Sequence, residues 1–305
     1  MNKGKEYVAF LSELQACVEA KLEGRVKGEI CTSIKNNGVA VTGLMLKGEE
    51  ESVAPNFYLD QQFVQWMHGT QTIEEIAEQL CKAYREEIKR NSRLVSEISF
   101  SWTEFRRNVF LRLVNRDKNK EQLEKIPHRE FMDLAVVYYY SVPISSGTCG
   151  TMLITKDHLT LLDITEEELH QAAQSNCERF QPAKICCMEE MVYSLGKKLG
   201  VELQESKSRS PFLYVMTNVN GVFGASAMIN PKELEYFSNK INNSFYILPS
   251  SVHELILVPY SREFCVEYFA GMVREINETQ VEATEVLSDS IYFFDKETKS
   301  LRRVA

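Results

Sequence analysis

Residues 245–260, FYILPSSVHELILVPY, place two short apolar runs on either side of one compact polar group. Pro249 and Pro259 bound the stretch that contains the polar group and the second run. Short aliphatic runs bounded by proline are typical of buried β-strands, whereas helices need a longer apolar period. The segment therefore predicts two strands, Phe245–Leu248 and Leu255–Val258, which are joined by the polar residues between them.

Strand patterns elsewhere in the chain come in adjacent pairs. Glu29–Lys35 and Val39–Lys47 flank Asn36-Asn37-Gly38, and Asn and Gly tolerate the positive φ of a tight hairpin. Ile291–Asp295 and Ser300–Val304 predict a second hairpin of the same kind. Paired strands with short turns favour an α+β fold, with a mixed or largely antiparallel sheet and flanking amphipathic helices, over a doubly wound parallel sheet.

Capping motifs mark where several helices begin. Thr72 with Glu75 forms a capping box, in which two side chains satisfy otherwise unpaired backbone N–H groups, and Thr165 with Glu168 forms another. Asn230-Pro231 predicts a third helix start, with Asn as the cap and Pro at the first helical position.

Three further segments carry specific expectations. Val109–Asn115 predicts a strand with Arg112 pointing outward, and Val222–Ile229 predicts a strand that follows an Asn/Gly turn. Ser261 is expected to cap a helix that carries an apolar set at four-residue spacing. That set is Phe264, Tyr268, Met272 and Ile276.

Length bounds the domain organisation. A chain of 305 residues can bury a large core without disulfides or metals. We expect an N-terminal lobe of helix, hairpin and helix over residues 1–95 and a main α+β lobe over residues 96–305. The alternative is one continuous domain of residues 1–305.

Charge and cysteine usage exclude several classes of partner and location. The formal charge of −8 argues against nucleic acid, because phosphate binding needs clustered Lys and Arg. No segment reaches the ~18 uninterrupted apolar residues of a membrane span, so we expect no membrane partner. The eight scattered cysteines are typical of reduced thiols, and the N-terminus has no secretory pattern, so we expect a cytoplasmic protein.

The polar group between the two central strands is the candidate catalytic site. Ser250, Ser251, His253 and Glu254 are the residue types of a nucleophile, a base and an orienting carboxylate. Their spacing fits poorly, because Ser251 and His253 lie roughly 6.6 Å apart along an extended strand, whereas a hydroxyl–imidazole hydrogen bond needs about 3 Å. The alternative is that the serines bond backbone groups at a turn, while packing places His253 and Glu254.

No motif predicts a cofactor or a metal. His253-Glu254 is not followed by the second histidine of a zinc-protease helix, because residue 257 is Leu. Residues 218–224 match neither the GxGxxG nor the phosphate-loop pattern. The remaining histidines and Cys186-Cys187 lack metal-ligand spacing.

Several segments, taken in order, resemble a known family. They are APNFYLD (54–60), the capped helix from Thr72, GTMLITKDHL (150–159), TEEELHQAAQSN (165–176), YVMTN (214–218), GASAMI (224–229), ILPSSVHELILVP (247–259) and LSDSIYFFD (287–295). The family consists of uncharacterised bacterial proteins, chiefly from anaerobic, gut-type Gram-positive bacteria, and is known by a domain of unknown function. The resemblance covers nearly the whole chain and implies a cytoplasmic bacterial protein, but it implies no activity, cofactor or catalytic residue.

Two functions remain open. The first, which we favour, is a non-enzymatic protein that binds another protein or takes part in a small assembly. The second is a serine-type hydrolase or acyl-transfer enzyme that uses Ser250 or Ser251 with His253 and a carboxylate such as Glu254. Unchanged labelling by a serine-directed probe after both serines are replaced by alanine would count against the second function.

Overall fold

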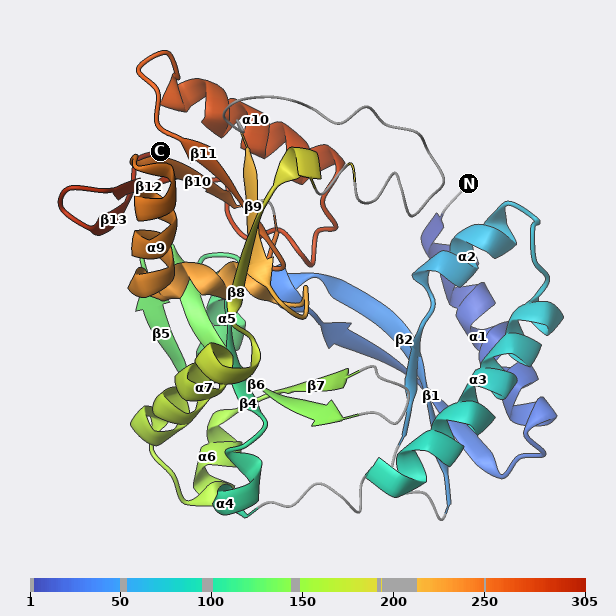
Figure 1. Cartoon of the computed structure of the whole chain (residues 1–305). Helices are drawn as coiled ribbons and strands as arrows, with labels where there is room; N and C mark the ends of the chain where they lie inside the picture. The colour runs from blue at the N-terminus through green and yellow to red at the C-terminus, as the bar shows by residue number, and fades with distance from the viewer. Residues whose placement is uncertain are drawn as a thin grey trace. The chain divides into compact units, whose positions relative to one another are not determined.

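The computed structural model describes residues 3–49, 54–94, 101–143, 149–190, 193, 213–249 and 251–305. The chain forms two compact units, the first of residues 1–99 with 142–150 and the second of residues 100–141 with 151–305. Residues 95–100, where the sequence places a boundary, lie outside the described part. Helices and antiparallel strand pairs occur in both units, so the predicted α+β fold is confirmed (Figure 1).

The first unit packs two long helices against a three-stranded antiparallel sheet of order β1-β2-β3. The predicted hairpin is confirmed, since β1 and β2 pair from Val26↔Gly48 to Ile34↔Ala40. Asn37, with φ 62°, supplies a left-handed residue at the turn. The elements are α1 (Lys3–Lys21), β1 (Val26–Ile34), η1 (Asn36–Gly38), β2 (Ala40–Gly48), β3 (Asn56–Tyr58), α2 (Asp60–Met67) and α3 (Ile73–Leu94).

The first predicted capping box is present at the start of α3. The Thr72 N–H donates to Glu75 Oε2 at 2.8 Å, and the Glu75 N–H donates to Thr72 Oγ1 at 3.2 Å. Two N–H groups that a helix start leaves unpaired are satisfied in this way. The helix then begins at Ile73, as the motif predicts.

The second unit contains a six-stranded antiparallel sheet of order β13-β12-β10-β11-β9-β8. The central strand β10 is buried along its whole length, and it pairs with β11 from Phe245↔Pro259 to Pro249↔Leu255, so both predicted strands are confirmed. The predicted C-terminal hairpin is also confirmed as β12 and β13. The strands are β8 (Ala183–Cys187), β9 (Tyr214–Asn218), β10 (Phe245–Pro249), β11 (Leu255–Pro259), β12 (Tyr292–Asp295) and β13 (Ser300–Arg303).

Two helices pack on opposite faces of this sheet. Helix α9 (Pro231–Ile241) places Phe237 against Phe245, with ring centroids 4.9 Å apart. Helix α10 (Val266–Thr279) places Phe269 against Tyr246, with ring centroids 5.6 Å apart. Because Phe245 and Tyr246 are consecutive on β10, their side chains point to opposite faces, and the sheet is covered on both.

A second sheet in the same unit has the order β4-β6-β5, and β7 pairs with β6. Helix α7 packs on β4, where Asn176 Nδ2 donates to Val109 O at 2.8 Å. The elements are α4 (Trp102–Phe105), β4 (Val109–Asn115), α5 (Lys120–Leu123), β5 (His128–Phe131), β6 (Leu134–Pro143), β7 (Cys149–Leu153), α6 (Lys156–Leu162) and α7 (Glu166–Phe180).

One carboxylate joins the two sheets of the second unit. Asp133, in the turn between β5 and β6, accepts from Tyr292 O–H at 2.9 Å and from Ser288 O–H at 2.7 Å. Tyr292 is fully buried, and its burial, followed by the negative charge of Asp133, raises its pKa above the ordinary value. The tyrosine therefore stays protonated and acts as the donor to Asp133.

The strand predicted over Val222–Ile229 is wrong. Gly224–Ile229 forms η2, a 3-10 helix that follows Phe223 in the left-handed region at φ 54°. A Cβ at Gly224 would lie 2.5 Å from Asn218 N and 2.6 Å from His253 O. The backbone at Gly224 therefore lies very close to the backbone of Asn218 and His253, and only a residue without a side chain fits there.

The outward orientation predicted for Arg112 is also wrong, although its strand is confirmed as β4. Its guanidinium Cζ lies 4.6 Å from the ring centroid of Phe223. Its Nε is buried and has no hydrogen-bond partner within the described part of the chain. Burial lowers the pKa of Arg112 from its ordinary value.

The two C-terminal helices differ in how well their starts are predicted. Helix α9 is capped as expected, because Asn230 Oδ1 accepts from Lys232 N at 3.1 Å. Helix α10 begins at Val266, so the prediction of Ser261 as its cap is wrong. Ser261 Oγ instead accepts from Glu263 N at 3.3 Å in the preceding turn.

Candidate functional site

The polar group predicted as a catalytic site lies in the hairpin between β10 and β11. Ser250 is outside the described residues. Ser251 is buried; its Oγ accepts from His253 N at 3.0 Å, and its own N–H donates to Glu254 O at 3.2 Å. Ser251 therefore satisfies the backbone of a tight turn, as serine commonly does where a chain reverses.

The imidazole of His253 is held on both nitrogens. Nδ1 accepts from the Phe223 N–H at 3.1 Å, and Nε2 lies 3.4 Å from Glu285 Oε1. The ring also stacks on Phe223, with centroids 5.5 Å apart and planes 13° apart. Because Nδ1 accepts from a backbone N–H, the ring proton of the neutral form is on Nε2, facing Glu285.

Ser251 and His253 thus contact each other through the hydrogen bond from the His253 backbone N–H to Ser251 Oγ. The carboxylate beside the His253 ring belongs to Glu285, which precedes strand β12, whereas the sequence predicted Glu254. Neither Phe223 nor Glu285 carries a local signal, because their proximity to His253 arises only from the tertiary fold. The contacts fit the interpretation of a turn held by packing, and catalysis by Ser250, Ser251, His253 and Glu254 stays a prediction.

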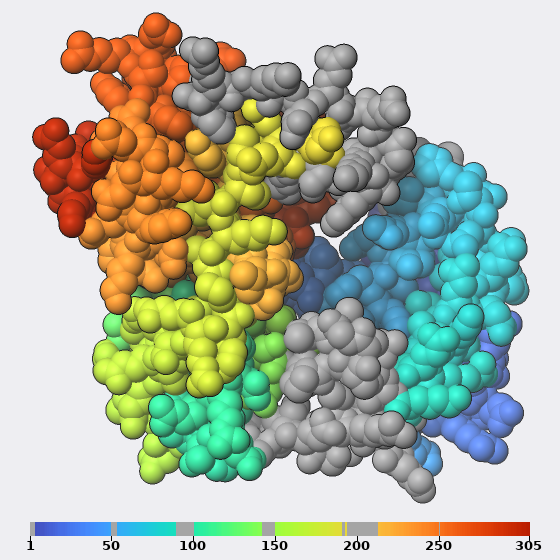
Figure 2. Space-filling model, viewed as in Figure 1, coloured from blue at the N-terminus to red at the C-terminus, as the bar shows by residue number. Residues whose placement is uncertain are grey.

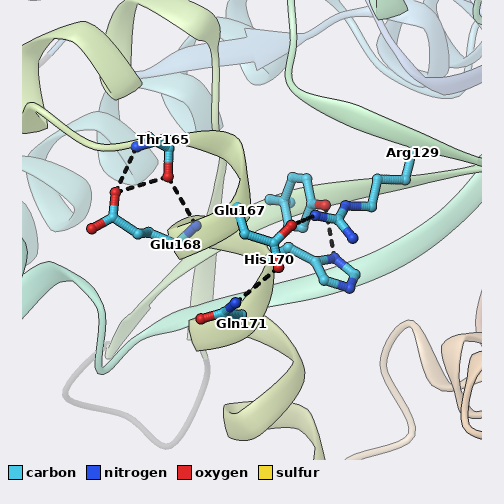
Figure 3. A network of polar contacts seen from close by, with 7 residues as sticks. Arg129, Thr165, Glu167, Glu168, His170 and Gln171 are labelled. Carbon is cyan, nitrogen blue, oxygen red and sulfur yellow. Dashed lines mark hydrogen bonds and ion pairs between the residues drawn. The ribbon is translucent and has the colours of Figure 1, made fainter.

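A second polar network joins α7 to β5 and β6 (Figure 3). Arg129 on β5 pairs with Glu167 on α7, and Gln171 Nε2 donates to the other oxygen of Glu167 at 2.8 Å. Tyr138 on β6 bonds His170 Nδ1 at 2.9 Å. One turn earlier on α7, the predicted Thr165–Glu168 capping box is present.

Burial fixes the protons in this network. Burial raises the pKa of Tyr138 to about 12, although the positive charge of Arg129 acts to lower that pKa. Burial and then Arg129 lower the pKa of His170. At neutral pH both groups are uncharged, so the Tyr138 O–H donates to His170 Nδ1. Tyr138 is only 1% exposed, so its hydroxyl holds α7 on the sheet and cannot reach a substrate in solution.

The network predicts a stability that falls at both ends of the pH scale. The ordinary pKa of histidine is 6.5, and folding lowers the pKa of His170. As pH drops below 6.5, His170 therefore binds a proton in the unfolded chain before it does so in the folded chain, and stability falls. As pH rises from 10.0 toward about 12, the unfolded chain loses the Tyr138 proton first. We expect the urea midpoint to fall in both windows, with smaller losses in His170→Gln at acid pH and Tyr138→Phe at alkaline pH.

The predicted loss of stability at acid pH can be checked directly by the titration of His170. The His170 ring resonance should titrate with a midpoint below 6.5, and Arg129→Met should move that midpoint upward by removing a nearby positive charge. A midpoint at or above 6.5 in the unmutated chain would contradict the assignment. Because five histidines contribute resonances, His170→Gln serves to assign the signal.

The described residues contain no obvious metal centre and no membrane helix. No group of three or more His, Cys, Asp or Glu side chains among them is arranged to hold a metal ion. None of the described helices combines the length and the apolar character that crossing a bilayer requires.

Fold and contacts together define an α+β protein of two units, in which hydrogen bonds and an imidazole–carboxylate contact hold the polar hairpin of the larger sheet. A family model described as "Family of unknown function (DUF5688)" matches residues 7–296. The chain belongs to this family, and the resemblance to a domain-of-unknown-function family is confirmed. A search of curated proteins and a search of solved structures each found no match.

Proposed function

We propose that this chain is a non-enzymatic, cytoplasmic protein-binding component that docks a protein partner on helix α10. The observation that carries the proposal is an apolar stripe on α10, in which Tyr268 and Ile276 are exposed and Met272, between them, is half-buried against the core. Tyr268 is 70% exposed and Ile276 is 39% exposed. Aromatic side chains and methionine are enriched where proteins meet, and exposed tyrosine is a frequent source of binding energy.

The stripe is exposed because of how α10 is anchored. Helix α10 buries Phe269, Val273 and Asn277, each one position after a stripe residue, together with Ala270. Asn277 Nδ2 donates to Ser288 O at 3.0 Å and to Asp289 Oδ1 at 2.8 Å. These polar contacts fix which face of the helix points to the sheet and leave Tyr268 and Ile276, beside that face, accessible to solvent.

The surroundings of the stripe indicate the chemistry of its partner. Gly271 lies in the helix interior on the exposed side, and a Cβ there would meet open space. A helix-interior glycine is destabilising by roughly 0.5–1 kcal/mol relative to alanine, and here it permits close approach of another chain. Exposed Glu267, Glu275 and Glu278 outnumber Arg274, so the partner is expected to present an apolar centre with a basic rim.

Site-specific photocrosslinking in the full chain tests the proposal. A benzophenone amino acid in place of Tyr268 should give a discrete protein adduct in cells. The matched control is Tyr236, a 64% exposed tyrosine on α9, where the same substitution should not give that adduct. Adducts of equal yield at both positions, or none at Tyr268, would overturn the proposal.

Affinity measurements with the purified partner then supply the quantitative criterion. Tyr268→Ala should weaken binding at least tenfold, which corresponds to about 1.4 kcal/mol, while Tyr236→Ala leaves it unchanged. Gly271→Ala should also weaken binding although it stabilises the free chain, so unfolding cannot account for its effect. Equal affinities of Tyr268→Ala and the unmutated chain would contradict the docking site even if an adduct forms.

A further inference from the structure

A polar groove lies between the residues around α4 and one face of α7. Its volume is about 320 Å³, and its lining includes Trp102, Arg106, Glu168, Gln171, Ser175 and Asn176. In Figure 2 the green residues that follow position 100 border the yellow-green surface of α6 and α7. The volume is at the lower end of the range for small-molecule sites, roughly 300–1,000 Å³.

Hydrogen bonds made by the lining residues hold the walls of the groove in place. Asn176 Nδ2 donates to Arg106 O and to Val109 O, both at 2.8 Å, and so fixes the segment after α4 against α7. Glu168 is held by Thr165, whose N–H and O–H both donate to its Oε2 at 2.8 Å. Supporting hydrogen bonds of this kind fix the positions of side chains before a ligand binds, as binding sites require.

The groove carries one cation and one anion that are not paired with each other. The guanidinium Cζ of Arg106 lies 5.8 Å from the Trp102 ring centroid, and within the described residues it makes no ion pair with a carboxylate. The hydrogen bonds from Thr165, and then the charge of Arg106, lower the pKa of Glu168, which is therefore ionised at neutral pH. A ligand of a single charge would gain from one of these groups and be repelled by the other.

We propose that this groove binds a small zwitterion of the α-amino acid class. Its carboxylate would lie on the Arg106 guanidinium, which matches a carboxylate in planar, bidentate geometry. Its ammonium group would lie on the Glu168 carboxylate, and its side chain would run along the Trp102 indole. Gln171 and Ser175 add polar groups on the α7 wall. This site is independent of the α10 stripe.

The chain offers a built-in fluorescent reporter for this site. It contains two tryptophans, Trp66 and Trp102, so a Trp66→Phe variant leaves the indole of the groove as the sole tryptophan. Titration with a panel of free L-amino acids should give a saturable change in its emission. L-Leucine should bind at least tenfold more tightly than isocaproate or isoamylamine, which each keep one of its two charged groups. Calorimetry on the unmutated chain should give the same ranking.

Charge-removing variants separate the groove from the rest of the surface. Arg106→Gln and Glu168→Gln should each weaken amino acid binding at least tenfold, and glutamine at position 168 preserves the capping box. The matched controls are Arg179→Gln and Glu178→Gln on α7, outside the groove, which should bind as the unmutated chain does. No saturable response to any amino acid, equal binding of a singly charged analogue, or an equal loss in the controls would overturn the proposal.

Discussion

Gly224→Ala is expected to destabilise the second unit by about 3 kcal/mol, because the new methyl group has no space. Its Cβ would lie 2.2 Å from Thr217 Oγ1, 2.5 Å from Asn218 N and 2.6 Å from His253 O. Two of these three atoms belong to the backbone and cannot rotate away. Relief of the clash requires η2 to move from β9 and from the β10–β11 hairpin. Urea denaturation followed by circular dichroism measures the loss.

The matched control is Gly271→Ala on α10, where a Cβ meets nothing within 4 Å. That substitution should raise stability by about 0.5–1 kcal/mol, because alanine is the better helix former. A Gly224→Ala variant with the urea midpoint of the unmutated chain would show that the close approach between η2 and the hairpin is absent in solution. The two variants add the same atoms, so their difference reports only the surroundings.

Asp133→Ala should be similarly damaging, with an expected loss of about 3–5 kcal/mol, because it removes two hydrogen bonds to a charged acceptor. Asp133 is the acceptor for both Ser288 and Tyr292, and Tyr292 is completely buried. Removal of the carboxylate leaves the buried tyrosine O–H without the charged acceptor that it has in the folded chain. Thermal and urea denaturation of the purified variant measure the effect.

A double-mutant cycle shows whether the loss arises from this contact. Tyr292→Phe alone should cost about 1.5–3 kcal/mol, and adding it to Asp133→Ala should cost much less than that. Non-additivity of at least about 1 kcal/mol is expected for two residues in direct contact. Strictly additive losses would mean that Asp133 and Tyr292 act independently and that the carboxylate does not join the two sheets.

Much of the fold can be predicted from local patterns. Thr72 with Glu75 and Thr165 with Glu168 begin helices where predicted, because a capping box is satisfied within four consecutive residues. The two strands of the central hairpin were equally predictable, since apolar runs beside prolines have few alternatives. In each case the atoms that decide the structure are close together in the sequence.

The predictions that were wrong depended instead on contacts between distant parts of the sequence. Gly224 begins a 3-10 helix that lies against the backbone of His253, and Arg112 turns inward onto Phe223. Both outcomes depend on segments far along the chain. The α4–α7 groove was missed for the same reason. Glu168, Gln171 and Ser175 follow a helical spacing that marks one face of α7, but nothing in their sequence shows that the segment after Trp102 lies opposite.

The contact between Asp133 and Tyr292 also has a consequence for biosynthesis. The two residues are 159 positions apart, and ribosomes add roughly 5–20 residues per second, so about 8–30 s pass before the carboxylate meets its donor. During that interval the Val- and Tyr-rich strand β6 is already made, while the segment that joins its turn to the larger sheet is not. A nascent chain of this protein is therefore open to aggregation or to chaperone capture until translation has passed Tyr292.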